Sequence, residues 1–259
     1  MEKTDNTAAQ YGVAEGEVSV SAILRSGSRQ VFRIFIDKNI EGRKKYAVAP
    51  LERLAKSKGV VIEYADRDVI DGYASGTTHG GVCALVGERI WDEFDTMCPP
   101  EKNGFYVVLD GIEDPFNFGQ ALRAIYAAGA DGVILPKRNW MSASSVVARS
   151  SAGASEFIPA CVCDVENAVE TLAKRGYKIV CTDHSASAVS MLKADLRRPL
   201  LLLVGGERRG ISAKLKAMAT STVRIDYGRR FDASLGAAEA SAILAFEVLR
   251  QNSKQEEIR

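Results

Sequence analysis

The sequence predicts an α/β protein with two domains, and three observations support this prediction. Strand-like apolar runs alternate with helical patterns along most of the chain, as they do in layered domains whose helices cover a sheet. Residues 200–204 are apolar at every position, which is typical of a parallel strand buried on both faces. Pro99 and Pro100, which interrupt helices and strands alike, separate a shorter first part from a longer second part.

The first part of the chain is expected to form a small domain. Residues 1–17 show no periodic pattern, so we expect a flexible tail there. The domain itself is expected over residues 18–95, followed by a linker over residues 96–103. Its predicted elements are a short helix near 20–24, a strand at 31–36, a helix at 46–58, a strand at 60–64, a helix at 66–73 and a strand at 82–86.

The second domain is expected over residues 104–259. Its predicted strands are 105–109, 133–135, 178–182, 200–204 and 222–225, with a short extended piece at 157–159. Its predicted helices are 118–128, 142–151, 165–175, one opened by Ser212, and 234–250. Strands alternating with helices in this way favour a mainly parallel sheet.

Composition sets limits on the class of protein. The chain has 259 residues, of which 46% are hydrophobic and 26% charged, so it can build real cores. No apolar run approaches the roughly 20 residues of a membrane-spanning helix, and the polar start is unlike a signal peptide. We therefore expect a cytoplasmic protein without membrane contact. The net charge of +1 means that any nucleic-acid contact depends on a local basic patch.

The cysteines predict neither disulfides nor a metal site. They are five in number and scattered through apolar segments, namely Cys83, Cys98, Cys161, Cys163 and Cys181. Cys161 and Cys163 lack the two-residue gap of a zinc pair, and the chain has only His79 and His184 to complete a site. We expect reduced, buried cysteines.

The strand at 105–109 runs into a loop of turn-forming and acidic residues, and a helix follows. In a parallel sheet such a loop lies at the carboxyl end of a strand, where ligands bind. Asn117 occupies the position expected for the helix N-cap. Arg123 lies about one and a half turns further on, close enough to the helix opening to reach an anion there.

A second candidate site is the glycine-rich turn over residues 205–210, which follows the strand at 200–204. It matches neither the dinucleotide-binding fingerprint nor the phosphate-binding loop of nucleotide hydrolases. Its exposed backbone suits a mostly neutral ligand at close range. Taken alone, it is equally a plain tight turn before a helix.

Three ordered segments resemble the motifs of the SpoU RNA ribose methyltransferases, which belong to the SPOUT superfamily. The segments are Asp110-x-x-x-Asp114-Pro115-x-Asn117-x-Gly119-x-x-x-Arg123, then Gly205-Gly206-Glu207-Arg208-Arg209-Gly210, and finally Ile225-Asp226-Tyr227 with Ser234-Leu235-Gly236. The resemblance covers roughly residues 18–252. Residues 18–95 resemble the ribosomal-protein-type RNA-binding domain that many of these enzymes carry. His79-Gly80-Gly81-Val82 stands at the position where those enzymes have a His-x-Gly-Val turn.

The resemblance implies a fold, a cofactor and a reaction. The fold is a parallel α/β sheet with a trefoil knot, usually found in a homodimer. The cofactor is S-adenosyl-L-methionine (AdoMet), and the substrate is RNA, with rRNA favoured. The residues implied for AdoMet binding are Gly205, Gly206, Ile225 and Leu235, and those implied for catalysis are Arg123, Asn117, Glu207 and Ser234.

The densest basic stretch comprises Arg43-Lys44-Lys45 with Arg53, Lys56 and Lys58. It is interpreted either as a contact with RNA phosphates or as an ordinary solvated helix face. The first interpretation gives the first domain the role of binding the RNA substrate.

The third motif departs from the family pattern. Gly236 stands where the family has Asn, and Asp226-Tyr227 replaces Pro-Met. Loss of the amide leaves open an alternative function, a SpoU-like protein that binds RNA without transferring a methyl group. A third hypothesis, an unrelated α/β enzyme acting on a nucleotide, is disfavoured because the nucleotide fingerprints are absent.

Overall fold

The computed structural model describes residues 11–40, 42–76, 78–137, 139–142, 144–185 and 187–253. Its contacts divide the chain into two compact units, which are described separately. Unit 1 contains residues 1–90 together with 141–157, and unit 2 contains residues 91–140 together with 158–259. Residues 1–10 of the expected tail, and the side chains of Arg43 and Lys44, lie outside the described part.

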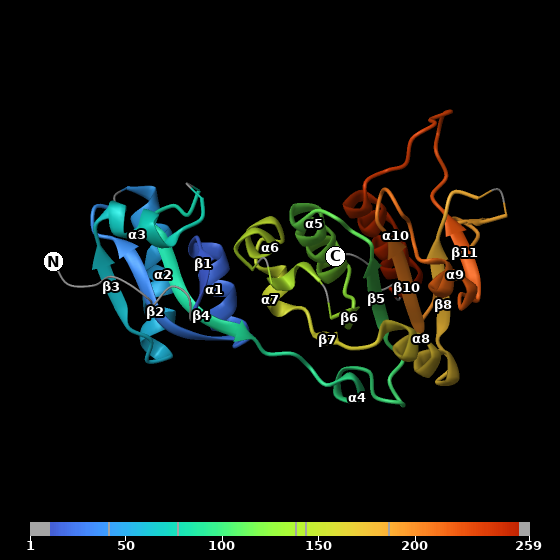
Figure 1. The fold of residues 1–259 in the computed structure, drawn as a ribbon, viewed down its shortest axis with the longest axis horizontal. Helices are drawn as coiled ribbons and strands as arrows, with labels where there is room; N and C mark the ends of the chain where they lie inside the picture. The colour runs from blue at the N-terminus through green and yellow to red at the C-terminus, as the bar shows by residue number, and fades with distance from the viewer. Residues whose placement is uncertain are drawn as a thin grey trace. The chain divides into compact units, whose positions relative to one another are not determined.

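Unit 1 contains a four-stranded sheet in the order β1-β4-β2-β3 (Figure 1). Its strands are β1 (Gly12–Glu15), β2 (Arg29–Asp37), β3 (Ile62–Ala65) and β4 (Val82–Arg89). β4 pairs antiparallel with β1 and with β2, whereas β2 and β3 are parallel. The strands predicted at 31–36, 60–64 and 82–86 are thereby confirmed.

The helices of unit 1 cover both faces of this sheet. They are α1 (Glu17–Ser26), α2 (Arg43–Ser57), α3 (Arg67–Tyr73), α6 (Ser144–Ser150) and α7 (Ala154–Phe157). Ile34 and Ile36 of β2 pack with α1 and α2, while Phe35, between them, packs with Ile70 of α3 on the other face. This alternation follows from the strand period of two.

The expected tail at 1–17 is too long, because Gly12–Glu15 form β1 and α1 begins at Glu17. The four residues of β1 are too few to show a period, and their pairing is determined by the free edge of β4. Glu15 lies opposite Cys83 in this pairing. Only tertiary contacts reveal such a strand.

Buried ion pairs attach α7 to the sheet of unit 1. Glu156 lies 3.1 Å from Nε of Arg29 and 3.3 Å from Nη1 of Arg89, and all three side chains are almost fully buried. Ser28 also donates a hydrogen bond to Glu156 at 2.6 Å. From the sequence we placed residues 104–259 in the second domain, whereas residues 141–157 belong to unit 1, where α6 and α7 contact α1.

Unit 2 contains a seven-stranded sheet in the order β7-β6-β5-β10-β8-β11-β9. Every pair in it is parallel, which confirms the predicted sheet type. The strands are β5 (Phe105–Asp110), β6 (Gly132–Leu135), β7 (Ala160–Val162), β8 (Lys178–Thr182), β9 (Val189–Ser190), β10 (Leu200–Gly205) and β11 (Ser221–Arg224). The two-residue β9 was not predicted.

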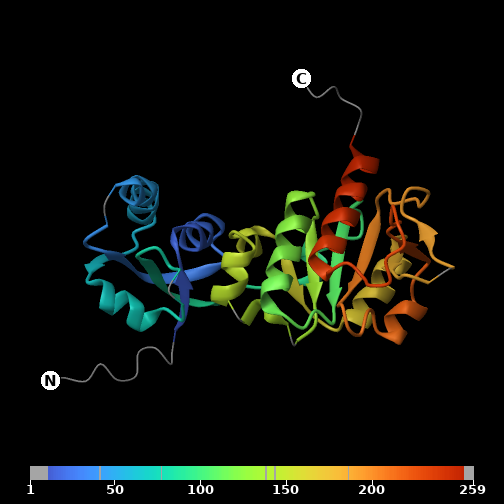
Figure 2. The same cartoon turned by 90° about the horizontal axis from the view of Figure 1, so that it is seen from above.

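Helices cover both faces of this sheet as well. They are α4 (Phe94–Met97), α5 (Pro115–Ala127), α8 (Val165–Lys174), α9 (Ala213–Ala217) and α10 (Ala237–Asn252), with a 3-10 turn η1 (Trp140–Ser142) where the chain enters unit 1. Leu201 and Leu203 of β10 pack in one core with α8 and α9. α10 contacts β10 and lies beside α5 (Figure 2).

The segment expected as a linker, 96–103, is partly packed into unit 2. Met97 and Cys98 are buried in the core that contains α8, and the hydroxyl of Tyr106 donates a hydrogen bond to the Met97 carbonyl at 2.6 Å. The prolines therefore end a packed turn and do not mark a free connection. The trefoil knot stays a prediction.

Candidate functional site

β5 and β10 lie side by side at the centre of the sheet of unit 2. Their carboxyl ends are level, with Asp110 opposite Gly205. The strand order runs outward from this pair in both directions, through β6 on one side and β8 on the other. In open parallel sheets such a switch point is where ligands bind.

The loop after β5 is capped by Asp114, not by Asn117 as we predicted. Asp114 is the N-cap of α5, and its side chain accepts a hydrogen bond from the Asn117 backbone N–H at 2.7 Å. Pro115 explains the difference, because its missing N–H and fixed φ suit the first helical position. The Asn117 side chain is thereby available for a contact elsewhere.

The glycine-rich turn over residues 205–210 is packed against the loop after β5. The Gly206 N–H donates to the Asp110 carbonyl at 2.7 Å, and the Gly210 N–H donates to the Gly206 carbonyl at 2.9 Å. A Cβ on Gly206 would lie 1.8 Å from the Gly111 carbonyl oxygen. These glycines therefore allow a close approach of the protein's own backbone, and the predicted close approach to a ligand stays a prediction.

Gly206→Ala should therefore lower the stability of unit 2. Neither backbone can yield easily, so we expect a loss of about 1–3 kcal/mol in the free energy of unfolding, measured by chemical denaturation. Gly228→Ala is the matched control, because no atom lies within 4 Å of its added Cβ and a change of less than about 0.5 kcal/mol is expected. Equal stability of the two variants would contradict the packing argument.

Glu207 connects the three motif segments. Its Oε1 accepts hydrogen bonds from Nδ2 of Asn117 at 3.3 Å and from the backbone N–H of Ala237, the first residue of α10, at 3.4 Å. The structure thus brings together two predicted catalytic residues and the residue that directly follows the third motif.

The other two predicted catalytic residues are not part of this contact. Arg123, on α5, and Ser234, before α10, are both exposed, and neither side chain has a hydrogen bond or ion pair to another described residue. Both are therefore accessible to a substrate. Whether they act in catalysis stays a prediction.

The predicted cofactor residues lie on adjoining loops of unit 2. Ile225 follows β11 and is half-buried, as is Leu235. The Leu235 N–H donates to the Tyr227 hydroxyl at 3.1 Å, which connects the two parts of the third motif. Half-buried apolar side chains such as these suit a flat, mostly neutral group such as adenine.

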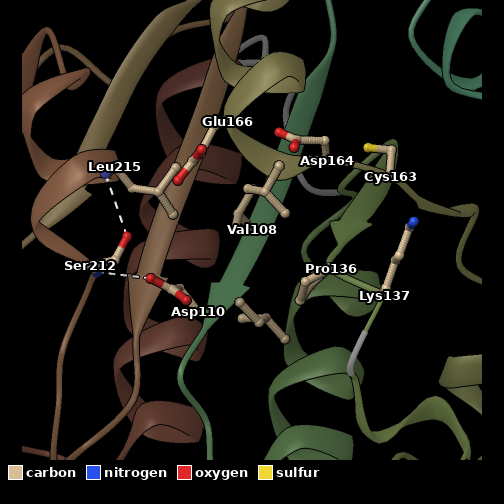
Figure 3. Close-up of a pocket in the computed structure, with 11 residues that line it drawn as sticks. Val108, Asp110, Pro136, Lys137, Cys163, Asp164, Glu166, Ser212 and Leu215 are labelled. Atoms are coloured by element: carbon tan, nitrogen blue, oxygen red, sulfur yellow. Dashed lines mark hydrogen bonds between the residues drawn. The ribbon is translucent and has the colours of Figure 1, made fainter.

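A cavity of about 480 Å³ lies between the carboxyl ends of β5, β6 and β7 (Figure 3). Its lining residues are Val108, Leu109, Asp110, Pro136, Lys137, Cys163, Asp164, Val165, Glu166, Ser212 and Leu215. None of the eight predicted site residues is among them. Its size is within the range of small-molecule sites.

The polar groups of the cavity come from separate loops, which is why the sequence did not reveal it. Asp110 accepts a hydrogen bond from the Ser212 N–H at 2.8 Å, as Figure 3 shows, with Cys163 and Lys137 on the opposite side. A hydrogen bond with Cys161 lowers the pKa of Cys163. The sequence had indicated Asp110 as a residue of the first motif and Ser212 as the start of a helix, but neither as part of a cavity.

All five cysteines are free thiols, and Cys163 alone is not buried. Within the described ranges, no group of three or more His, Cys, Asp or Glu side chains is arranged to hold a metal ion. No helix of the described residues is long and apolar enough to cross a membrane.

Comparison with known families identifies the family of this chain. A model of the SpoU rRNA methylase family matches residues 104–246, which is more than half of the sequence. The chain belongs to the SpoU rRNA methylase family. A second model, for RNA 2′-O ribose methyltransferase substrate binding, matches residues 13–89. The predicted family resemblance is confirmed.

Individual SpoU-family relatives align over nearly the whole chain. The 23S rRNA (guanosine-2′-O-)-methyltransferase RlmB of Shewanella oneidensis is 31% identical, with 90% of this chain and 94% of that protein covered. RlmB of Pseudomonas syringae is also 31% identical, with 94% and 95% covered. The crystal structure of an AdoMet-bound rRNA methyltransferase from Sinorhizobium meliloti is 25% identical, with a TM-score of 0.76 over 95% of this chain and 89% of that one.

Proposed function

We propose that this SpoU-family protein transfers the methyl group of AdoMet to a ribose 2′-hydroxyl of RNA, with rRNA as the substrate. The observation that carries the proposal is the meeting of the three motif segments at Glu207, at the carboxyl ends of β5 and β10. The rRNA methyltransferases that align over nearly the whole chain support the choice of RNA.

AdoMet fits the loops that carry Gly205, Gly206, Ile225 and Leu235. The hydrogen bond from Leu235 to Tyr227 keeps the two halves of the third motif together, so that both can flank one ligand. When bound, AdoMet supplies an electrophilic methyl group on a sulfonium. The role of the protein is to orient the 2′-hydroxyl toward that group and to accept or share its proton.

Arg123 is proposed to hold the phosphate next to the target ribose. A guanidinium is effectively always protonated, so a role as the proton acceptor would need an extreme environment, whereas Arg123 is exposed. A planar guanidinium binds phosphate through two hydrogen bonds. Glu207 fixes the orientation of Asn117 through its 3.3 Å hydrogen bond, and Ser234 offers a hydroxyl to substrate or cofactor.

Calorimetry with AdoMet, followed by transfer of tritiated methyl groups into unmodified rRNA transcripts, tests the proposal. Wild-type protein should bind AdoMet and label rRNA. Binding without labelling would favour the RNA-binding alternative, and the absence of both would contradict the proposed function.

Cys163→Phe distinguishes the two places where AdoMet can bind. The added ring should enter the cavity of Figure 3 from the side opposite Asp110, which is the one motif residue among those that line it. We expect unchanged AdoMet affinity in calorimetry, with folding checked by circular dichroism. Loss of AdoMet binding by a folded variant would assign the cofactor to the cavity and overturn the loop assignment.

Gly236→Asn tests whether the missing amide limits catalysis. Gly236 has φ −60°, so Asn is not strained there. The nearest atoms to its Cβ would be side-chain atoms of Glu239 and Glu207, the closest at 2.2 Å. Glu239 is exposed and can turn away. We expect an equal or higher rate of methyl transfer. Activity that appears only in the variant would favour the alternative function for the wild-type chain.

We further propose that the protein works in the cytoplasm and that unit 1 binds the RNA substrate.

We also propose that the protein forms a homodimer. Phe246 and Leu249 of α10 are large apolar side chains that remain exposed in the single chain. A second copy would cover them. Phe246→Glu should therefore lower the mass measured by analytical ultracentrifugation from dimer to monomer, and an unchanged mass would place any dimer contact elsewhere.

A further inference from the structure

The segment between β11 and α10 carries an aromatic side chain that is largely exposed. It rises from the sheet of unit 2 as a loop, shown in red in Figure 1. Phe231 lies in this loop with 57% of its surface exposed. An exposed phenylalanine is common by itself, so its meaning depends on what surrounds it.

A row of aromatic rings supports Phe231 from one side. The Phe231 and Tyr227 ring centroids are 5.9 Å apart, and those of Tyr227 and His184 are 5.7 Å apart. Tyr227 is itself fixed by the hydrogen bond that its hydroxyl accepts from Leu235. Phe231 therefore packs against Tyr227 at the outer end of the row, and the rest of its side chain faces solvent.

Arginines flank this ring. Arg229 is exposed and has no hydrogen bond or ion pair with any residue that the structure describes. Arg230 lies 3.4 Å from Asp232, but both side chains are more than 80% exposed, so this pair is weak. The other acid of the loop, Asp226, is already paired with Arg224 at 3.2 Å.

Further cations lie on the neighbouring glycine-rich turn. Arg208 and Arg209 are more than 80% exposed and share one acid, Glu113, at 3.5 Å each. Glu207, on the same turn, is bonded to the start of α10. Both loops therefore present arginines at the carboxyl edge of the sheet, where the predicted site residues lie.

We propose that the segment Gly228–Asp232 binds single-stranded RNA beside the target ribose, with Phe231 stacked on a nucleobase and Arg229 and Arg230 on the adjoining phosphates. The inference rests on the proposed function and extends it to a recognition element. Aromatic rings beside arginines bind single-stranded nucleic acids with little dependence on the nucleotide sequence. A protein partner would need a contiguous apolar patch, whereas Phe231 is surrounded by charge. Ser234 and Leu235 follow one residue after the segment, which places the bound base next to the site.

The test is RNA affinity measured by fluorescence anisotropy on the full-length protein, with a labelled 12-nucleotide poly(U) strand and an unmodified 23S rRNA transcript. Phe231→Ala should weaken binding about tenfold, and Phe231→Trp should restore it, because a larger ring still stacks. Arg229→Ala should lower the salt dependence of binding, because it removes a phosphate contact. AdoMet affinity and sedimentation mass should not change in any of these variants.

The outcomes separate this inference from the proposed function. If wild-type protein binds RNA but transfers no methyl group, while Phe231→Ala weakens binding, the proposed function fails and the RNA-binding segment stands. Wild-type RNA affinity in Phe231→Ala overturns the inference even if methyl transfer is observed. A fall in AdoMet affinity would instead assign Phe231 to the cofactor, and a change in mass would assign it to a contact between copies, and either result overturns the inference.

Discussion

Arg123→Ala should lower methyl transfer about 100-fold while AdoMet affinity and the free energy of unfolding remain unchanged. Arg123 is exposed on α5 and has no polar partner among the described residues, so its removal breaks no contact within the fold. The proposed cofactor contacts are made by other loops. Tritium transfer into rRNA transcripts measures the first effect, and calorimetry and chemical denaturation measure the other two.

Two further variants sharpen this experiment. Arg123→Lys should not rescue the rate, because an ammonium group cannot reproduce a planar, bidentate contact with phosphate. Arg197→Ala is the matched control, because Arg197 is an exposed arginine of the same unit whose ion pair is with Asp195. Arg197 lies just before β10, at the opposite edge of the sheet, and full activity is expected. Full activity of Arg123→Ala would show that Arg123 is not a catalytic residue.

Glu156→Gln should have the largest effect on stability. Glu156 is the buried partner of Arg29 and Arg89, and the three side chains are 1%, 6% and 4% exposed. The substitution removes the charge with which Glu156 neutralises two buried guanidinium groups, which costs several times more than an exposed ion pair contributes. We expect the free energy of unfolding to fall by about 3–5 kcal/mol, measured by chemical denaturation.

Glu63→Gln provides the same chemical change at an exposed site of unit 1. Its partner is Arg33, and the two side chains are 43% and 50% exposed. Its expected effect is less than about 1 kcal/mol, because water screens such a pair. If Glu156→Gln destabilised the protein no more than Glu63→Gln does, the buried cluster would contribute nothing beyond an ordinary surface pair.

Local patterns predicted most elements and the family. The apolar run at 200–204 became β10, fully buried at the centre of the sheet, and Ser212 proved to be the N-cap of α9, as its position suggested. The three motif segments identified the SpoU family, which the family comparison confirms. Such patterns can be predicted because strand periods, helix caps and short motifs depend on residues that are close in sequence.

The wrong predictions lie at the ends of elements and in short strands, where neighbouring residues give similar or weak signals. Asn117 and Asp114 are both good N-cap residues. Asp114 is the N-cap of α5 because Pro115 occupies the first helical turn. Likewise, β1 was taken for tail because four residues carry no recognisable period. The homodimer, the knot and the roles of the site residues remain predictions of the resemblance.

The sequence by itself therefore determined most of the elements, the parallel sheet and the family of this protein. Only the tertiary structure decided that Glu207 joins Asn117 to the start of α10, that Gly206 abuts Gly111, and that α7 belongs with unit 1 through Glu156. These contacts join residues far apart in the chain. Their existence depends on strand order and on which helix covers which face, and no local period records either of these.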